Sequence, residues 1–243
     1  MAIQMASSSL GQASSLVREG ISIFAGADGH SDRSEAIRTL RTALVSMQSL
    51  LRGVPQNYLL FSSVNAEGEG DCQQFAMDLV EIPDLYDETN YYIHKHALLL
   101  SEDATRSWQE HDALAFSCAT VLFNIALVFH QEGRRSANRR TLRKALNIYE
   151  KALDIVVCEQ EIVCSKTFAF LVLATMNNIS CIYRHIGMIQ NAVNTHERLV
   201  LFAAHVRQAG TSWPLEVSEI IQKFIHNRSI DTRAPSCQAA RSA

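Results

Sequence analysis

Residues 176–199, MNNISCIYRHIGMIQNAVNTHERL, decide how this chain folds. Read at the helical period, the stretch predicts two short helices joined by a tight turn. Gly187 is expected to end the first helix, because glycine adopts the left-handed C-terminal conformation without a steric penalty at Cβ. The small residues Ser180 and Ala192 fall where the two helices would press closest. The stretch therefore predicts a helical hairpin with narrow side chains at its interface.

The same pattern occurs upstream, in a hairpin expected over residues 107–160. There Gly133 corresponds to Gly187, while Ala126 and Ala145 take the two small positions. The turn RRSANRR is predicted to be about seven residues longer than in a standard helical repeat. The pattern thus predicts two successive hairpins, of which the second extends over residues 164–208.

A third, partial match lies near the N-terminus, over residues 13–51. Gly20 and Ala36 take the small positions of this hairpin. Three polar residues before its second helix are plausible N-caps, because their side chains can accept a hydrogen bond from a free backbone N–H: Ser31, Asp32 and Ser34.

The remaining segments do not follow the repeat. Residues 53–103 are acidic and turn-prone, with short alternating apolar runs, and predict an irregular insertion or a short β-hairpin. Residues 213–228 predict a terminal helix that covers the open end of the last hairpin, with Ser212 as its N-cap. Residues 1–12 and 229–243 are expected to be disordered.

The hairpins resemble the tetratricopeptide repeat (TPR), a helix–turn–helix unit of about 34 residues. More narrowly, ATVLFNIALVFHQEG, LRKALNIYEKALDI and LATMNNISCIYRHIG resemble a group of uncharacterised TPR-like proteins of diatoms. The resemblance covers most of the chain outside residues 53–103 and the tail. It implies an all-α superhelix of about three hairpins plus a terminal helix. Lengthened turns and the 54-residue offset from Ala126 to Ser180 depart from the family, so groove shape is not implied.

Composition limits the possible functions. The 243 residues are 47% apolar, with four prolines, ten glycines and a net charge of −3. This balance predicts no general attraction to nucleic acid or to an anionic membrane. No apolar run is expected to span a bilayer, because even long candidates such as Thr167–Met176 are too short. No secretory signal is evident either. The six cysteines form no C-x-x-C pair and suit a reducing compartment, so an intracellular, cytoplasmic location is expected.

The family resemblance implies a protein-interaction scaffold that binds a peptide or helix of another protein on its concave face. The sequence contains no G-x-S-x-G, Walker A, G-x-G-x-x-G or H-E-x-x-H motif, so neither enzymatic activity nor a cofactor is expected. The first helix of each hairpin would line this face, with Arg18 and Ser22 in the first hairpin. The residues expected to contact the partner in the other hairpins are Asn124, His130, Arg139, Arg140, Asn177, Asn178 and Arg184.

Two alternatives stay open. The cationic cluster in residues 134–144 could bind an acidic peptide, a phosphate or RNA, although no aromatic residue for base stacking lies within it. The chain could instead be an enzyme that uses a metal at His94 and His96, with Cys72 or Asp84 as further ligands. Surface positions are the simpler interpretation of these two histidines, and of His130 beside Glu132. Burial is the simpler interpretation of Cys118 and Cys181.

Overall fold

The computed structural model describes residues 2–26, 30–53, 77–81, 93–101, 110–158, 166–208 and 213–227. Within these ranges the chain is mainly helical, with one two-stranded antiparallel sheet. The prediction of an all-α fold with a short β-hairpin is therefore confirmed. The elements are α1 (Ala2–Ala25), α2 (His30–Gly53), β1 (Met77–Glu81), β2 (His96–Leu100), α4 (Glu110–Arg135), α5 (Arg139–Cys158), α6 (Lys166–His185), α7 (Ile189–Gln208) and α8 (Leu215–His226).

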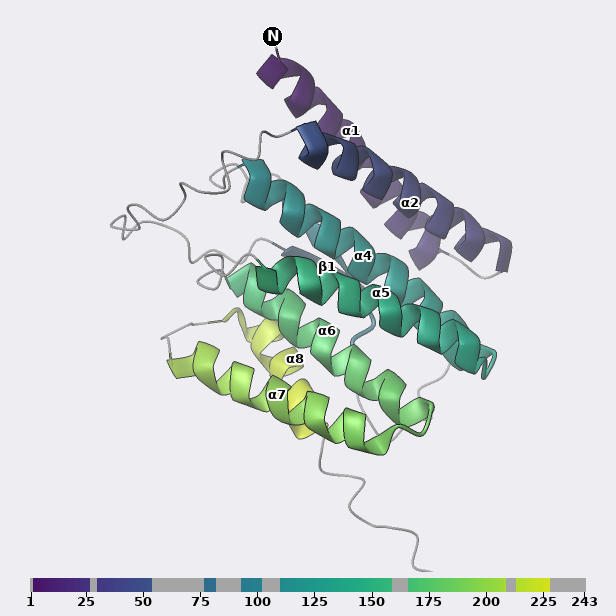
Figure 1. The fold of residues 1–243 in the computed structure, drawn as a ribbon, viewed down its shortest axis with the longest axis vertical. Coiled ribbons are helices and arrows are strands. Elements are labelled where there is room, and N and C mark those ends of the chain that lie inside the picture. The colour runs from purple at the N-terminus through teal and green to yellow at the C-terminus, as the bar shows by residue number, and fades with distance from the viewer. Residues whose placement is uncertain are drawn as a thin grey trace, which may run out of the picture.

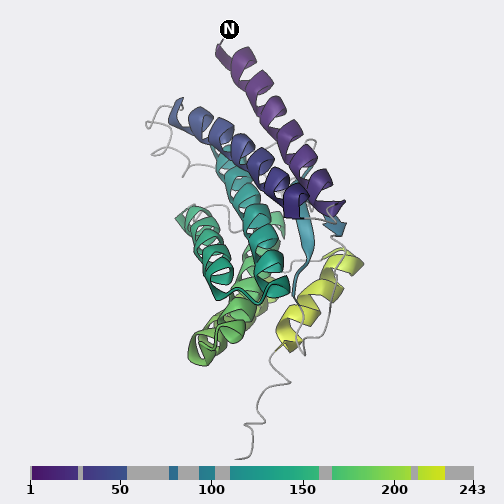
Figure 2. The same ribbon diagram turned by 90° about the vertical axis from the view of Figure 1, so that its right-hand side faces the viewer.

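Three helical hairpins stack one after another: α1 with α2, α4 with α5, and α6 with α7 (Figure 1). The strand β2 packs on α4, and α8 packs on α6 and α7. Figure 2 shows β2 and α8 on one side of the stack and α5 on the other. We call the side of α4 and α6 that β2 and α8 cover the inner face.

The small residues at the hairpin interfaces are buried as the sequence predicts. Ala126 and Ala145 of the second hairpin are 0% exposed, and Ser180 and Ala192 of the third are 3% and 1% exposed. The Ser180 hydroxyl donates a 3.0 Å hydrogen bond to the carbonyl of Ala192. In the third hairpin, narrow side chains therefore lie where α6 and α7 approach each other closely.

The turns of the second and third hairpins have the same length, so the predicted long turn is wrong. α4 ends at Arg135 and α5 begins at Arg139, which leaves three residues, as between α6 and α7. The N–H of Asn138 bonds the carbonyl of Gly133 at 2.8 Å, just as Met188 bonds Tyr183 at 2.8 Å. The structural offset between these hairpins is therefore 50 positions rather than 54.

A residue in the left-handed conformation lies in the middle of the turn in both hairpins. In the third hairpin it is Gly187, with φ 83°, as the sequence predicts. In the second it is Ala137, with φ 49°, rather than Gly133. Gly133 instead lies inside α4, where a Cβ atom would come within 2.8 Å of Leu142 on α5. Gly133 is thus required for close packing and not for turn geometry.

The first hairpin is longer than predicted. α1 begins at Ala2, so residues 2–12 are helical and not disordered. α2 begins at His30, which places Ser31, Asp32 and Ser34 inside the helix rather than at its cap. Gly20 does meet α2 closely, because an added Cβ would lie 2.8 Å from Leu40.

The C-terminal helix is present, and it follows Pro214, with no side-chain cap. The predicted cap Ser212, the acidic part of the insertion and residues 229–243 lie outside the described residues.

One helical segment is long and apolar enough to cross a bilayer, contrary to the prediction that no such run exists. It is Ala113–Arg135 in α4, and 89% of its most apolar window is buried inside the protein. α4 contacts α1, α2, α5, α6 and β2, and most of its residues from 113 to 130 are buried. These contacts identify α4 as the core helix of the stack.

Candidate functional site

Two asparagines on the inner face hold the backbone of an extended segment, residues 93–101. Asn124 on α4 accepts a hydrogen bond from the Leu98 N–H at 2.9 Å and donates one to the Leu98 carbonyl at 2.8 Å. Asn178 on α6 does the same to His94, with two bonds of 3.0 Å. We call these residues the asparagine pair. Each side-chain amide thus satisfies both polar backbone groups of one residue.

The asparagine pair lies along the edge of the extended segment, on the side where a third strand would otherwise pair with β2. Leu98 lies opposite Leu79 in the antiparallel register. Because the Leu98 N–H and carbonyl both bind Asn124, they point away from β1. The Leu98–Leu79 pair is therefore one of the pairs without mutual backbone hydrogen bonds. β1 satisfies one edge of β2, and Asn124 satisfies a position on the other edge.

His94 anchors the segment in an aromatic cage built by three helices. Its ring lies 5.9 Å from Phe123 of α4, 5.4 Å from Phe170 of α6 and 5.6 Å from Phe224 of α8, measured between centroids. The side chain is 0% exposed, and neither ring nitrogen has a hydrogen-bond partner among the described residues. Burial, followed by the nearby His96, lowers the pKa of His94 well below its usual value. The prediction that His94 is exposed is therefore wrong.

A chain of side-chain amides connects Asn178 to the end of α8. Asn178 donates to the Tyr149 hydroxyl at 3.0 Å and accepts from Asn177 at 3.2 Å. Asn177 in turn accepts a 2.6 Å hydrogen bond from Asn227, the residue that follows α8. The buried polar groups of α5, α6 and α8 are thus joined in one network, which raises the cost of removing any single member.

Four of the predicted partner-contact residues are therefore interior residues. Asn124, Asn178 and His130 are 0% exposed, and Asn177 is 1% exposed. Residues 93–101 cover Asn124 and Asn178, and Asn227 at the end of α8 covers Asn177. His130 is instead buried against Tyr149 of α5 and His185 of α6. The expectation that they lie open to a partner is wrong for this reason.

His130 lies deep between the second and third hairpins. Its ring centroid is 6.1 Å from that of Tyr149 and 6.4 Å from that of His185. Burial lowers its pKa well below the usual value, with smaller contributions from His185 and Arg134. The neighbouring Glu132 is not a free surface residue either, because it pairs with Arg33 of α2 at 3.0 Å.

The other predicted contact residues lie at or near the surface. Arg139 and Arg140 are exposed at the start of α5, and Arg184 is half-buried at the end of α6. Arg18 and Ser22 are exposed on α1. The structure therefore divides the predicted residues into a buried inner set and an exposed set on other parts of the stack.

The metal hypothesis gains no support from the described residues. The rings of His94 and His96 lie 5.2 Å apart, but no group of three or more His, Cys, Asp or Glu side chains gathers in the described ranges. The suggested further ligands, Cys72 and Asp84, lie outside these ranges. Cys118 and Cys181 are buried, as predicted, and form no disulfide with a described residue, and burial raises the pKa of each thiol to about 12.

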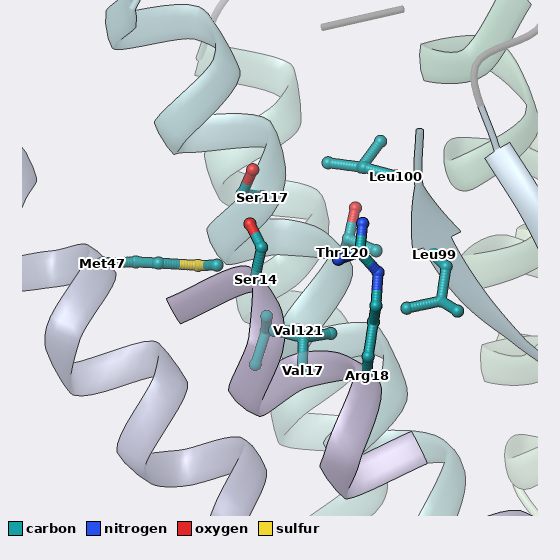
Figure 3. A pocket seen from close by; sticks show the side chains of 9 residues that line it. All are labelled: Ser14, Val17, Arg18, Met47, Leu99, Leu100, Ser117, Thr120 and Val121. Carbon is teal, nitrogen blue, oxygen red and sulfur yellow. The ribbon is translucent and has the colours of Figure 1, made fainter. Parts of the chain in front are cut away.

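A small hollow lies between α1, α2, α4 and β2. Figure 3 shows Arg18 reaching from α1 toward Thr120 of α4, with Ser14 below Ser117. Its volume is about 30 Å³, which is room for about one water molecule and too little for a substrate. The hydroxyls of Thr120 and Ser117 are already bonded to carbonyls one turn earlier in α4.

Sequence reasoning selected the asparagine pair but missed what surrounds it. Phe123, Phe170 and Phe224 come from three helices far apart in the sequence, and only the packed structure brings them to His94. Phe129 was also missed as the aromatic partner of a cation, since the Lys144 Nζ lies 4.4 Å from its ring centroid.

No protein-family model matches the chain, and neither a curated protein nor a solved structure matches it.

Proposed function

We propose that the chain is a protein-interaction scaffold whose inner face holds an extended polypeptide segment of a partner protein. The observation that carries the proposal is the asparagine pair. Asn124 and Asn178 recognise N–H and carbonyl groups, which every extended segment offers. Recognition through the backbone gives affinity, and pockets for alternate side chains give specificity. The TPR resemblance supports the same use of the first helices.

In the present structure residues 93–101 take the place of that partner segment. They supply a ring to the aromatic cage at His94 and a buried leucine at Leu98, four residues later. Under the proposal, a partner segment exchanges with this resident segment and meets the same two asparagines. The partner would therefore be extended, with a ring-bearing residue followed four positions later by an aliphatic one.

The proposal includes an intracellular, cytoplasmic setting. Cys118 and Cys181 are buried thiols that form no disulfide with a described residue, which suits a compartment where thiols stay reduced.

A competition experiment tests the exchange. The probe is a fluorescein-labelled peptide with the sequence of residues 92–102, YIHKHALLLSE, and the protein is the full chain. Leu98→Val in the protein trims the resident segment without emptying its site. We expect the peptide to bind this variant at least tenfold more tightly than wild type, because the resident competitor is weakened.

Two controls identify the asparagine pair as the determinant. A peptide N-methylated at the positions of His94 and Leu98 lacks both backbone donors, and we expect it to bind at least tenfold more weakly. Asn178→Ala introduced beside Leu98→Val should weaken the unmodified peptide to a similar degree. Equal binding of the two peptides, or no binding to Leu98→Val while its circular dichroism matches wild type, would overturn the proposal.

A further inference from the structure

The tip of the second hairpin carries a concentrated cationic surface. Within the last turn of α4 and the first turns of α5, five basic side chains are exposed and Arg134 beside them is half-buried. No acidic residue occurs between Gly133 and Tyr149, and none of these cations forms an ion pair with a described residue. We call the exposed group the basic patch: Arg135, Arg139, Arg140, Arg143 and Lys144.

The fold itself does not require these charges. The third hairpin makes the same three-residue turn with the same backbone hydrogen bonds, 50 positions later. Its residues at the positions of the four α5 cations are all uncharged: Ile189, Gln190, Val193 and Asn194. The molecule thus contains its own control, because the matching tip of the third hairpin forms without the four cations of α5.

The charges also oppose the local electrostatics of α5. The N-terminus of a helix carries partial positive charge, so cations in the first turn are unfavourable. α5 has no acidic residue in its first turn to offset this, and its cap is the neutral Asn138, which accepts from the Arg140 N–H at 2.9 Å. An anionic partner would relieve both the helix dipole and the repulsion among the cations.

We propose that the basic patch docks an acidic, Asp/Glu-rich polypeptide segment of a partner protein. An anion is favoured because the helix N-terminus and the side chains present the same sign of charge. A polypeptide is favoured over RNA because the aromatic ring that contacts the patch among the described residues, Phe129, is half-buried beneath Lys144 and is not free to stack on a base. The chain's net charge of −3 further argues against a general nucleic-acid surface.

This surface is distinct from the inner face. The basic patch lies at the end of the second hairpin, whereas the asparagine pair lies along α4 and α6 beneath β2. The two sites can therefore succeed or fail independently. Together they would allow the scaffold to hold two polypeptide segments at once.

Charge-matched variants of the full chain provide the test. The patch variant is Arg139→Gln, Arg140→Gln, Arg143→Gln and Lys144→Gln. The control removes the same number of exposed cations elsewhere, with Arg38→Gln, Arg41→Gln, Arg198→Gln and Arg207→Gln. The probe is a fluorescein-labelled peptide of alternating Glu and Ser, about twelve residues long, followed by anisotropy at low and at physiological salt.

We expect the patch variant to bind the acidic peptide at least tenfold more weakly than wild type, and the control to stay within about twofold. The wild-type affinity should fall as salt rises. Equal losses in both variants would mean that only net charge matters, and would overturn the site. Tighter binding of a single-stranded RNA or of phosphatidylserine vesicles than of the peptide, when lost in the patch variant, would overturn the assignment to a polypeptide.

A second variant guards against a folding artefact. Arg139→Glu with Arg140→Glu reverses the charge and places two acids in the first turn of α5, where the helix dipole favours them. We expect this variant to unfold at the same temperature as wild type or higher, and to lose binding of the acidic peptide. Retained binding by this folded variant would contradict the proposal.

Discussion

Asn178 and His94 are 84 residues apart in the sequence, yet they share two hydrogen bonds of 3.0 Å, one through each end of the asparagine amide. Asn178 is 0% exposed and also donates to the Tyr149 hydroxyl. A single buried side chain therefore connects the extended segment to α5 and α6. Its removal would leave the N–H and carbonyl of His94 without their partners.

We predict that Asn178→Ala lowers the free energy of unfolding by about 2–4 kcal/mol, because buried backbone groups lose their hydrogen bonds. Urea unfolding followed by circular dichroism measures this change. The matched control is Asn147→Ala, an exposed asparagine on α5, which should stay within about 0.5 kcal/mol of wild type. Similar losses in the two variants would contradict the role assigned to Asn178.

Acid should destabilise the fold through two buried histidines. His94 and His130 each have a pKa well below the usual value, mainly because of burial. Below the unfolded-state pKa, near 6.5, the unfolded chain binds more protons than the folded chain. Stability is therefore fully present above that pH and is lost as pH falls, by about 1.4 kcal/mol per pH unit for each histidine.

The measurement is urea unfolding between pH 7.5 and 5.5, a window above the titration of ordinary carboxylates. His94→Phe keeps a ring in the aromatic cage but removes one titrating group. We expect its stability to fall less steeply with pH than that of wild type, because His130 and the partly buried His185, whose pKa values burial also lowers, still contribute. An unchanged slope would show that His94 is not one of the responsible groups.

Gly133 should tolerate no side chain. An added Cβ would lie 2.8 Å from the Leu142 side chain and 2.9 Å from its backbone nitrogen, so helix α4 or α5 would have to move. We predict that Gly133→Ala destabilises the fold by about 1–3 kcal/mol. Gly11→Ala is the control, because nothing lies within 4 Å of its added Cβ, and it should be neutral or stabilising. Thermal unfolding of the two variants checks this difference.

The two left-handed turn residues predict opposite effects of exchanging alanine and glycine. Ala137 has φ 49°, where a Cβ atom is strained, whereas Gly187 has φ 83°. Ala137→Gly should stabilise the protein and Gly187→Ala should destabilise it, each by about 1 kcal/mol. Unfolding midpoints that move in the same direction for both variants would contradict this prediction.

The hairpin pattern could be predicted from the sequence, but the alignment of the second hairpin with the third could not. A shift of four residues rotates a helix by about 400°, so the same face returns with an error of only about 40°. The offset of 54 positions that relates Ala126 to Ser180 therefore matches the periodicity almost as well as the true offset of 50. Only the turn hydrogen bonds, such as Asn138 to Gly133, separate the two.

The burial of the asparagine pair could not be predicted for a different reason. A polar residue on a helix face signals that it needs a hydrogen-bond partner, without saying whether that partner is water or the chain itself. Asn124 finds its partner at Leu98, in a segment whose short alternating pattern gives no information about the helix beneath it. The aromatic cage of His94 likewise depends on three helices meeting, which no local pattern records.

The way Asn124 meets β2 also bears on aggregation. A strand whose N–H and carbonyl groups face outward is a template onto which another polypeptide can add, and proteins commonly block such rows with charges, prolines or bulges. Here helix α4 provides that protection, because the side-chain amide of Asn124 bonds the N–H and carbonyl of Leu98 on the side opposite β1. A mutation of Asn124 to an apolar residue would leave the buried N–H and carbonyl of Leu98 without partners. We expect β2 to separate from α4 more readily and to offer this edge to a second polypeptide, so fibril formation would accompany the loss of stability.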